Sequence, residues 1–108
     1  MPDEPRPNGG VRLSPLDRRG RPISAQVLSA AEAIARRAIS HAERLHLDPA
    51  TAANLLEEAA AAVSRVLRPE KMGEVRIDDL QSYLFRVFLR RLNRKYKQSV
   101  ARAAALER

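Results

Sequence analysis

The 108-residue sequence has no cysteine and no tryptophan, and its only aromatic residues are two tyrosines and two phenylalanines. The lack of cysteine excludes disulfides and thiolate metal sites. Two histidines, His41 and His46, are too few for a metal site without help from carboxylates. With so few aromatic residues, the core must be built from Leu, Val, Ile and Ala, which suits packed helices. The length leaves room for one small domain.

Long apolar runs and catalytic motifs are also missing. No run approaches the roughly 18–20 residues that a membrane-spanning helix needs, and the N-terminal MPDEPRPNGG lacks the cationic-then-apolar order of a signal peptide. The sequence contains no Gly-rich phosphate loop, no HExxH, no nucleophile elbow and no paired carboxylates in an apolar setting. We therefore expect a cytoplasmic protein that is not an enzyme and has no cofactor, metal, small-molecule substrate or membrane partner.

Positive charge is abundant and unevenly distributed. The net charge is +7, and residues 86–108 carry the equivalent of all of it, because residues 1–23 contribute +2 and residues 24–85 contribute −2. A block of cations attracts polyanions, of which nucleic acid is the commonest. An anionic membrane surface is the competing target.

Residues 1–22 contain five of the seven prolines and three of the four glycines. These residues disfavour helices and strands, so we expect a disordered arm over residues 1–22 and a helical domain over residues 23–108. The basic cluster of Arg18, Arg19 and Arg21 in this arm is either part of a solvated tail or a loose phosphate-binding segment.

Two apolar stripes of helical period follow the arm. The first helix is predicted to begin near Ser24, a plausible N-cap, and to end before Asp48-Pro49. The second is predicted over residues 50–67, with Asp48 as its N-cap. Their predicted apolar faces comprise Val27, Leu28, Ala31, Ile34, Ala35, Ala38, Ile39, Ala42 and Leu45, then Leu55, Leu56, Ala59, Ala62, Val63, Val66 and Leu67.

A third helix is predicted from Asp78 or Asp79, either of which can cap it, to about Ala105. It follows a break at residues 69–78, where Val75 and Ile77 could pack back on the core. Its predicted apolar face comprises Leu80, Tyr83, Leu84, Val87, Phe88 and Leu92, and its other face is cationic. The predicted fold class is all-α, a bundle of three helices, or four if a short extra turn forms.

The second and third helices carry motifs in a recognisable order. Asn54-Leu55-Leu56-Glu57-Glu58, ending at Arg65, matches part of the pattern D-L-V-Q-E ending in Trp-Arg, with Asn54, Glu57 and Ser64 in place of Asp, Gln and Trp. Tyr83-Leu84-Phe85-Arg86-Val87 follows an aromatic-Leu-aromatic-Arg pattern that turns strongly basic. In this order, residues 24–100 resemble the second conserved region of bacterial RNA polymerase sigma factors, especially the extracytoplasmic-function type.

The resemblance implies a transcription-initiation domain that contacts promoter DNA and core RNA polymerase. It implies DNA contacts by Tyr83, Phe85, Arg86, Arg90, Arg91, Arg94, Lys95 and Lys97, and polymerase contacts by Asn54, Leu55, Glu57, Glu58 and Arg65. Aromatic faces can stack on unpaired bases and cations can follow phosphates, although Tyr83 also lies on the apolar stripe and could pack in the core instead. The family's C-terminal helix-turn-helix has no counterpart before Arg108, so we expect a lone second-region domain, a truncated paralogue or one part of a split factor.

Two other hypotheses remain open. The chain could be a protein-interaction module, such as an adaptor that mimics a sigma domain without promoter recognition. Alternatively, the basic amphipathic helix could lie on an anionic membrane, which would require its apolar face to be free.

Overall fold

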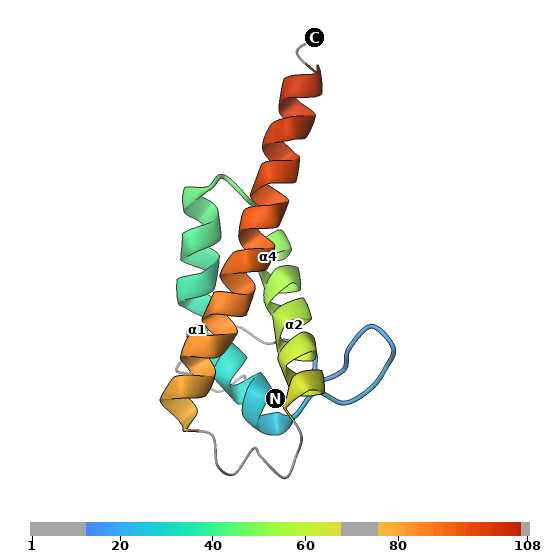
Figure 1. Ribbon diagram of the computed structural model, residues 1–108, viewed down its shortest axis with the longest axis vertical. Helices are drawn as coiled ribbons and strands as arrows, with labels where there is room; N and C mark the ends of the chain where they lie inside the picture. Colours follow the sequence, from blue (N-terminus) through green and yellow to red (C-terminus); the bar gives the residue numbers. More distant parts are fainter. Residues whose placement is uncertain (1–12, 68–75, 107–108) are drawn as a thin grey trace, which may run out of the picture.

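The computed structural model describes residues 13–67 and 76–106, which form three helices (Figure 1). Helix α1 spans Ala25–Arg44, α2 spans Pro49–Val66 and α4 spans Ile77–Leu106. The only strand-like pairing in these described ranges is an isolated antiparallel bridge between Leu16 and Pro22. The predicted all-α fold is confirmed. The predicted break near Pro69 and the packing of Val75 lie outside the described residues.

The N-cap predictions hold to different degrees for the three helices. Asp48 caps α2 as expected, because its carboxylate accepts the Thr51 backbone N–H at 2.8 Å and Pro49 takes the first turn. Ser24 occupies the N-cap position of α1, but its side chain makes no capping hydrogen bond. The prediction that Asp78 or Asp79 caps the last helix is wrong, because α4 begins at Ile77 and both carboxylates lie inside its first turn. There they still favour the positive end of the helix dipole.

The turn between α1 and α2 is closed by backbone hydrogen bonds. His46 adopts a left-handed φ of 60°, and its N–H donates to the Glu43 carbonyl at 2.9 Å. The Leu47 N–H donates to the Ala42 carbonyl at 3.1 Å. This pair of bonds is a Schellman motif, which satisfies the last carbonyls of α1 and reverses the chain towards α2.

The core lies where the three helices meet. Its largest fully buried side chains are Val27, Leu56, Val63, Leu84, Phe88 and Leu92. Small side chains fill much of the rest, including Ala31, Ala35, Ala38, Ala42, Ala52, Ala59 and Ala60, and they allow close approach of the helices. The predicted stripes are confirmed with two exceptions: Val66 is 66% exposed and Tyr83 is 36% exposed.

The segment from Leu13 to Ile23 packs on the bundle, although residues 13–22 were predicted to belong to the disordered arm. Leu13 and Ile23 are buried in the core. The Ser14 N–H donates to Glu57 Oε2 at 2.6 Å, and the Ser24 N–H donates to Ser64 Oγ at 2.9 Å. This N-terminal loop, residues 13–23, therefore lies against α2 (Figure 1).

Helix α4 is the longest element and extends past the other two helices (Figure 1). Its last buried residue is Leu92, so every described residue from Asn93 to Leu106 is exposed. At 1.5 Å per residue, about 20 Å of helix projects from the bundle. In the described part of the chain, no helix is both long enough and apolar enough to cross a membrane.

Candidate nucleic-acid interface

One face of α4 carries an exposed row of Tyr83, Arg86, Arg90, Arg94 and Lys97, which we call the cationic row. These residues follow one another at intervals of three or four, so at about 100° per residue they lie within an arc of about 80°. The row is about 21 Å long. The helix therefore holds one aromatic ring and four cations in line on a rigid support.

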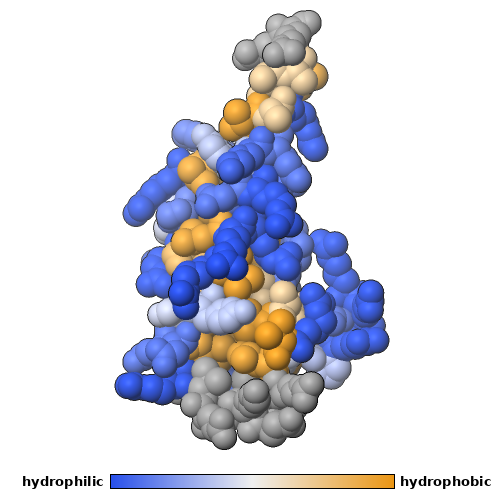
Figure 2. Space-filling view, viewed as in Figure 1, coloured by the Kyte–Doolittle hydropathy of each residue, from blue (hydrophilic) through white to orange (hydrophobic). Residues whose placement is uncertain are grey.

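The electrostatics of α4 are one-sided. Between Asp79 and the end of the described helix at Leu106 there is no acidic residue, whereas seven are basic. Figure 2 shows hydrophilic side chains gathered over the middle of α4. Because no carboxylate within the helix beyond its first turn opposes these cations, the surface favours a polyanionic ligand.

Tyr83 and Phe85 have different surroundings, although the family resemblance implied DNA contacts for both. Tyr83 is exposed beside Arg86, contrary to the core packing that its place on the apolar stripe suggested. Phe85 is half-buried against α1: the Arg37 guanidinium carbon lies 4.1 Å from its ring centroid and the His41 ring meets it edge-on at 6.2 Å. It also contacts Phe88 at 6.0 Å. Tyr83 is therefore better placed than Phe85 to stack on a base.

Arg91 and Lys95 lie on a different side of α4 from the cationic row. Together with Arg94 they line a hollow of about 350 Å³ between α4, the start of α2 and Arg18 of the N-terminal loop. Arg91 is half-buried, and its Nη1 donates to Glu58 Oε1 at 3.5 Å. One ion pair thus joins Arg91, which was predicted to contact DNA, to Glu58, which was predicted to contact polymerase.

The face of α2 predicted to dock on polymerase is partly covered. Leu55 is only 8% exposed and belongs to the core. Glu57 holds the Ser14 backbone, and Glu58 Oε2 pairs with Arg18 Nη2 at 3.4 Å. Asn54 and Arg65 remain exposed beside the loop. The side chains therefore share one surface, but the N-terminal loop occupies part of it.

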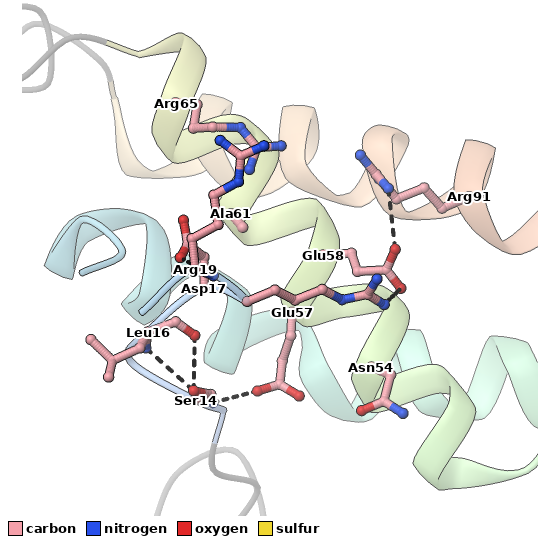
Figure 3. A pocket seen from close by; sticks show the side chains of 11 residues that line it. Ser14, Leu16, Asp17, Arg19, Asn54, Glu57, Glu58, Ala61, Arg65 and Arg91 are labelled. Atoms are coloured by element: carbon pink, nitrogen blue, oxygen red, sulfur yellow. Dashed lines mark hydrogen bonds and ion pairs between the residues drawn. The ribbon is translucent and has the colours of Figure 1, made fainter. Parts of the chain in front are cut away.

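This surface is hollowed where the loop meets α2. A cavity of about 460 Å³ is lined by Arg18 and Arg19 from the loop, by Glu57, Glu58 and Arg65 from α2, and by Arg91 from α4. Figure 3 shows Arg91 reaching Glu58 from one side and Arg19 and Arg65 lying near each other on the other. The sequence identified the loop arginines as a basic cluster but could not place them beside α4.

A tight turn presents Arg18 and Arg19. Asp17 Oδ1 accepts the Arg21 N–H at 2.8 Å and the Arg19 N–H at 2.9 Å. The hydrogen bond from Arg21 is the main cause of a lowered pKa for the Asp17 carboxyl. Gly20 completes the turn with a left-handed φ of 77°. The loop arginines are thus carried on a hydrogen-bonded hairpin.

One histidine packs against an aromatic ring and the other lies in a turn. His41 packs on Phe85, and His46 is exposed in the turn after α1. Within the described ranges, no group of three His, Cys, Asp or Glu side chains could hold a metal ion.

Comparisons with models of protein families, with curated proteins and with solved structures find no match to this chain.

Proposed function

We propose that the chain binds nucleic acid through the cationic row of α4. The observation that carries this proposal is the alignment of Arg86, Arg90, Arg94 and Lys97 on one exposed face of a helix without interspersed acids. Successive members of the row are about 4.5–6 Å apart along the axis. Cations spaced in this way can follow a phosphate backbone, and the release of counterions drives binding.

Unpaired bases are the preferred ligand in this proposal. Tyr83 is 36% exposed at the end of the row, where a base that turns away from the phosphate backbone can stack on its ring. Stacking of one base on an aromatic side chain contributes about 1–3 kcal/mol and tolerates any sequence. The combination of an aromatic face and a cation track is typical of proteins that bind single strands.

The more specific proposal is a sigma-like role at promoters. It is supported by the order of the two motifs on α2 and α4, by their packing in one bundle and by the exposure of most of the basic positions. In this role α4 contacts melted promoter DNA. Core polymerase is a further proposed partner of the α2 surface around Asn54 and Arg65, where access depends on the N-terminal loop.

The test is a pair of substitutions within the row. Arg90→Ala combined with Arg94→Ala removes two adjacent cations from an exposed face, so we expect a large loss of affinity for a labelled single strand without loss of folding. Arg36→Ala combined with Arg44→Ala is the matched control, because both side chains are exposed and lie on α1. Fluorescence anisotropy at low salt measures both variants. Equal losses would show that net charge alone governs binding and would contradict the proposal.

A protein-interaction module is the second candidate, favoured by the exposed Asn54 and Arg65 beside the loop. A pull-down of core polymerase, with and without promoter DNA, separates the two. Capture of polymerase by a chain that has no affinity for DNA would favour this candidate.

A further inference from the structure

The two hollows described above form one groove, which we call the arginine groove. They share Arg18, Asn54, Glu58 and Arg91, and they lie between the N-terminal loop, α2 and α4. Arg94 lines the groove and also belongs to the cationic row. The groove is therefore continuous, at Arg94, with the surface proposed to bind nucleic acid.

Glu58 holds the centre of this groove. Its Oε1 pairs with Arg91 at 3.5 Å and its Oε2 pairs with Arg18 at 3.4 Å, so one carboxylate bridges guanidinium groups from segments 73 residues apart in the sequence. The side chains of Glu58 and Arg91 are 31% and 30% exposed, whereas that of Arg18 is 83% exposed. The bridge is thus open to solvent on the Arg18 side, from which a ligand can enter.

The other two acids of the groove have backbone partners. Glu57 accepts the Ser14 N–H, and Asp17 accepts the N–H groups of its own turn. Around them stand six cations, Arg18, Arg19, Arg65, Arg91, Arg94 and Lys95, against three carboxylates. Arginine pairs alike with carboxylate and with phosphate through the same planar donors.

We propose that the arginine groove is a second binding site for the nucleic-acid backbone and that the Glu58 carboxylate occupies the place of a phosphate. A strand that leaves the cationic row at Arg94 enters the groove, and its phosphate displaces Glu58 from Arg18 and Arg91. Glu58 thereby lowers the affinity of the free protein for the strand. This inference rests on the proposed function, since it assigns a second segment of the same ligand.

The consequence is a gain of affinity on removing an acid. Glu58→Gln preserves the size of the side chain and one acceptor oxygen, but it removes the negative charge that competes for the two guanidinium groups. Because the ion pairs of Glu58 are partly exposed and therefore weak, we expect binding of a labelled oligo-dT strand to tighten about two- to fivefold.

Two further variants make the test specific. Glu43→Gln, on an exposed site of α1, changes the net charge equally and should tighten binding less. Arg91→Ala added to Glu58→Gln should abolish the gain. Thermal melts of each variant confirm that it is folded before binding is compared.

The outcomes separate this inference from the proposed function. A gain for Glu58→Gln that exceeds that for Glu43→Gln and requires Arg91 supports the groove. If Glu58→Gln binds no better than Glu43→Gln, or binds more weakly because the bridge only tethers the loop, the groove inference is overturned. Loss of binding in the Arg90 and Arg94 variant would then still sustain the cationic row. A wild-type chain that binds no strand overturns both.

Discussion

Replacing Phe85 with leucine tests whether this ring serves the fold or the ligand. The ring receives the Arg37 guanidinium at 4.1 Å, the edge of His41 at 6.2 Å and the tilted ring of Phe88 at 6.0 Å. A cation–π contact near the surface contributes about 0.5–1 kcal/mol, and each aromatic pair contributes about 0.5–1.5 kcal/mol beyond burial. Leucine keeps most of the apolar contact but loses these terms.

We therefore expect Phe85→Leu to lower the free energy of unfolding by about 1–2 kcal/mol, since such terms are not fully additive. For a domain of this size, each kcal/mol corresponds to about 4–8 °C in Tm. Thermal and urea unfolding followed by circular dichroism measure the loss. At a temperature where both proteins are folded, the affinity for a single strand should be unchanged.

Tyr83→Leu provides the contrasting result. Tyr83 is exposed at the end of the cationic row, so its loss should leave Tm nearly unchanged and weaken binding by about fivefold or more, given about 1–3 kcal/mol per stacked base. Tyr96→Leu is the matched control, because Tyr96 is 38% exposed on the same helix but lies about 140° away from Tyr83 around its axis. If Phe85→Leu instead keeps its Tm and loses affinity, the Phe85 ring contacts the ligand and does not stabilise the fold.

Two predictions concern the turns. Asp48→Ala should destabilise α2, and the contribution of Asp48 to stability should depend on pH. The hydrogen bond from the Thr51 N–H lowers the pKa of this carboxyl below its ordinary 3.8. The stabilisation is therefore present above pH 3.8 and is lost as the pH falls through the folded-state pKa. Acid titration of Tm in both proteins measures it, and parallel curves would contradict the assignment. Gly20→Ala should cost about 1 kcal/mol, because the left-handed φ of 77° disfavours a Cβ even though no heavy atom lies within 4 Å of it. Faster amide exchange at Arg19 and Arg21 would locate the effect in the hairpin, and unchanged exchange and stability would contradict it.

The helices were predictable because their signals are local. Asp48-Pro49 specifies the start of α2 through a side-chain cap and a fixed φ, and the periodic apolar residues from Leu80 to Leu92 specify the buried face of α4. The start of α4 was placed one or two residues late, because Asp78 and Asp79 suit the first turn of a helix as well as its N-cap.

The surroundings of individual side chains were not predictable, because they depend on contacts between distant segments. Tyr83 and Phe85 lie two residues apart in one motif, yet only the packing of Arg37 and His41 from α1 decides which ring is covered. The N-terminal loop likewise reads as a Pro- and Gly-rich arm. Its attachment depends on the burial of Leu13 and Ile23 and on hydrogen bonds between distant segments, such as that from Ser14 to Glu57 across 43 residues.

The salt dependence of binding shows whether the cationic row of α4 contacts a phosphate backbone. The affinity for a labelled single strand is measured over a series of salt concentrations for the wild-type chain and for the combined Arg90→Ala and Arg94→Ala variant. Each lost phosphate contact should reduce the slope of log affinity against log salt by about 0.7. We therefore predict that the double variant binds more weakly with a slope smaller by about 1.4. An unchanged slope, or a wild-type chain whose binding is insensitive to salt, would contradict the claim.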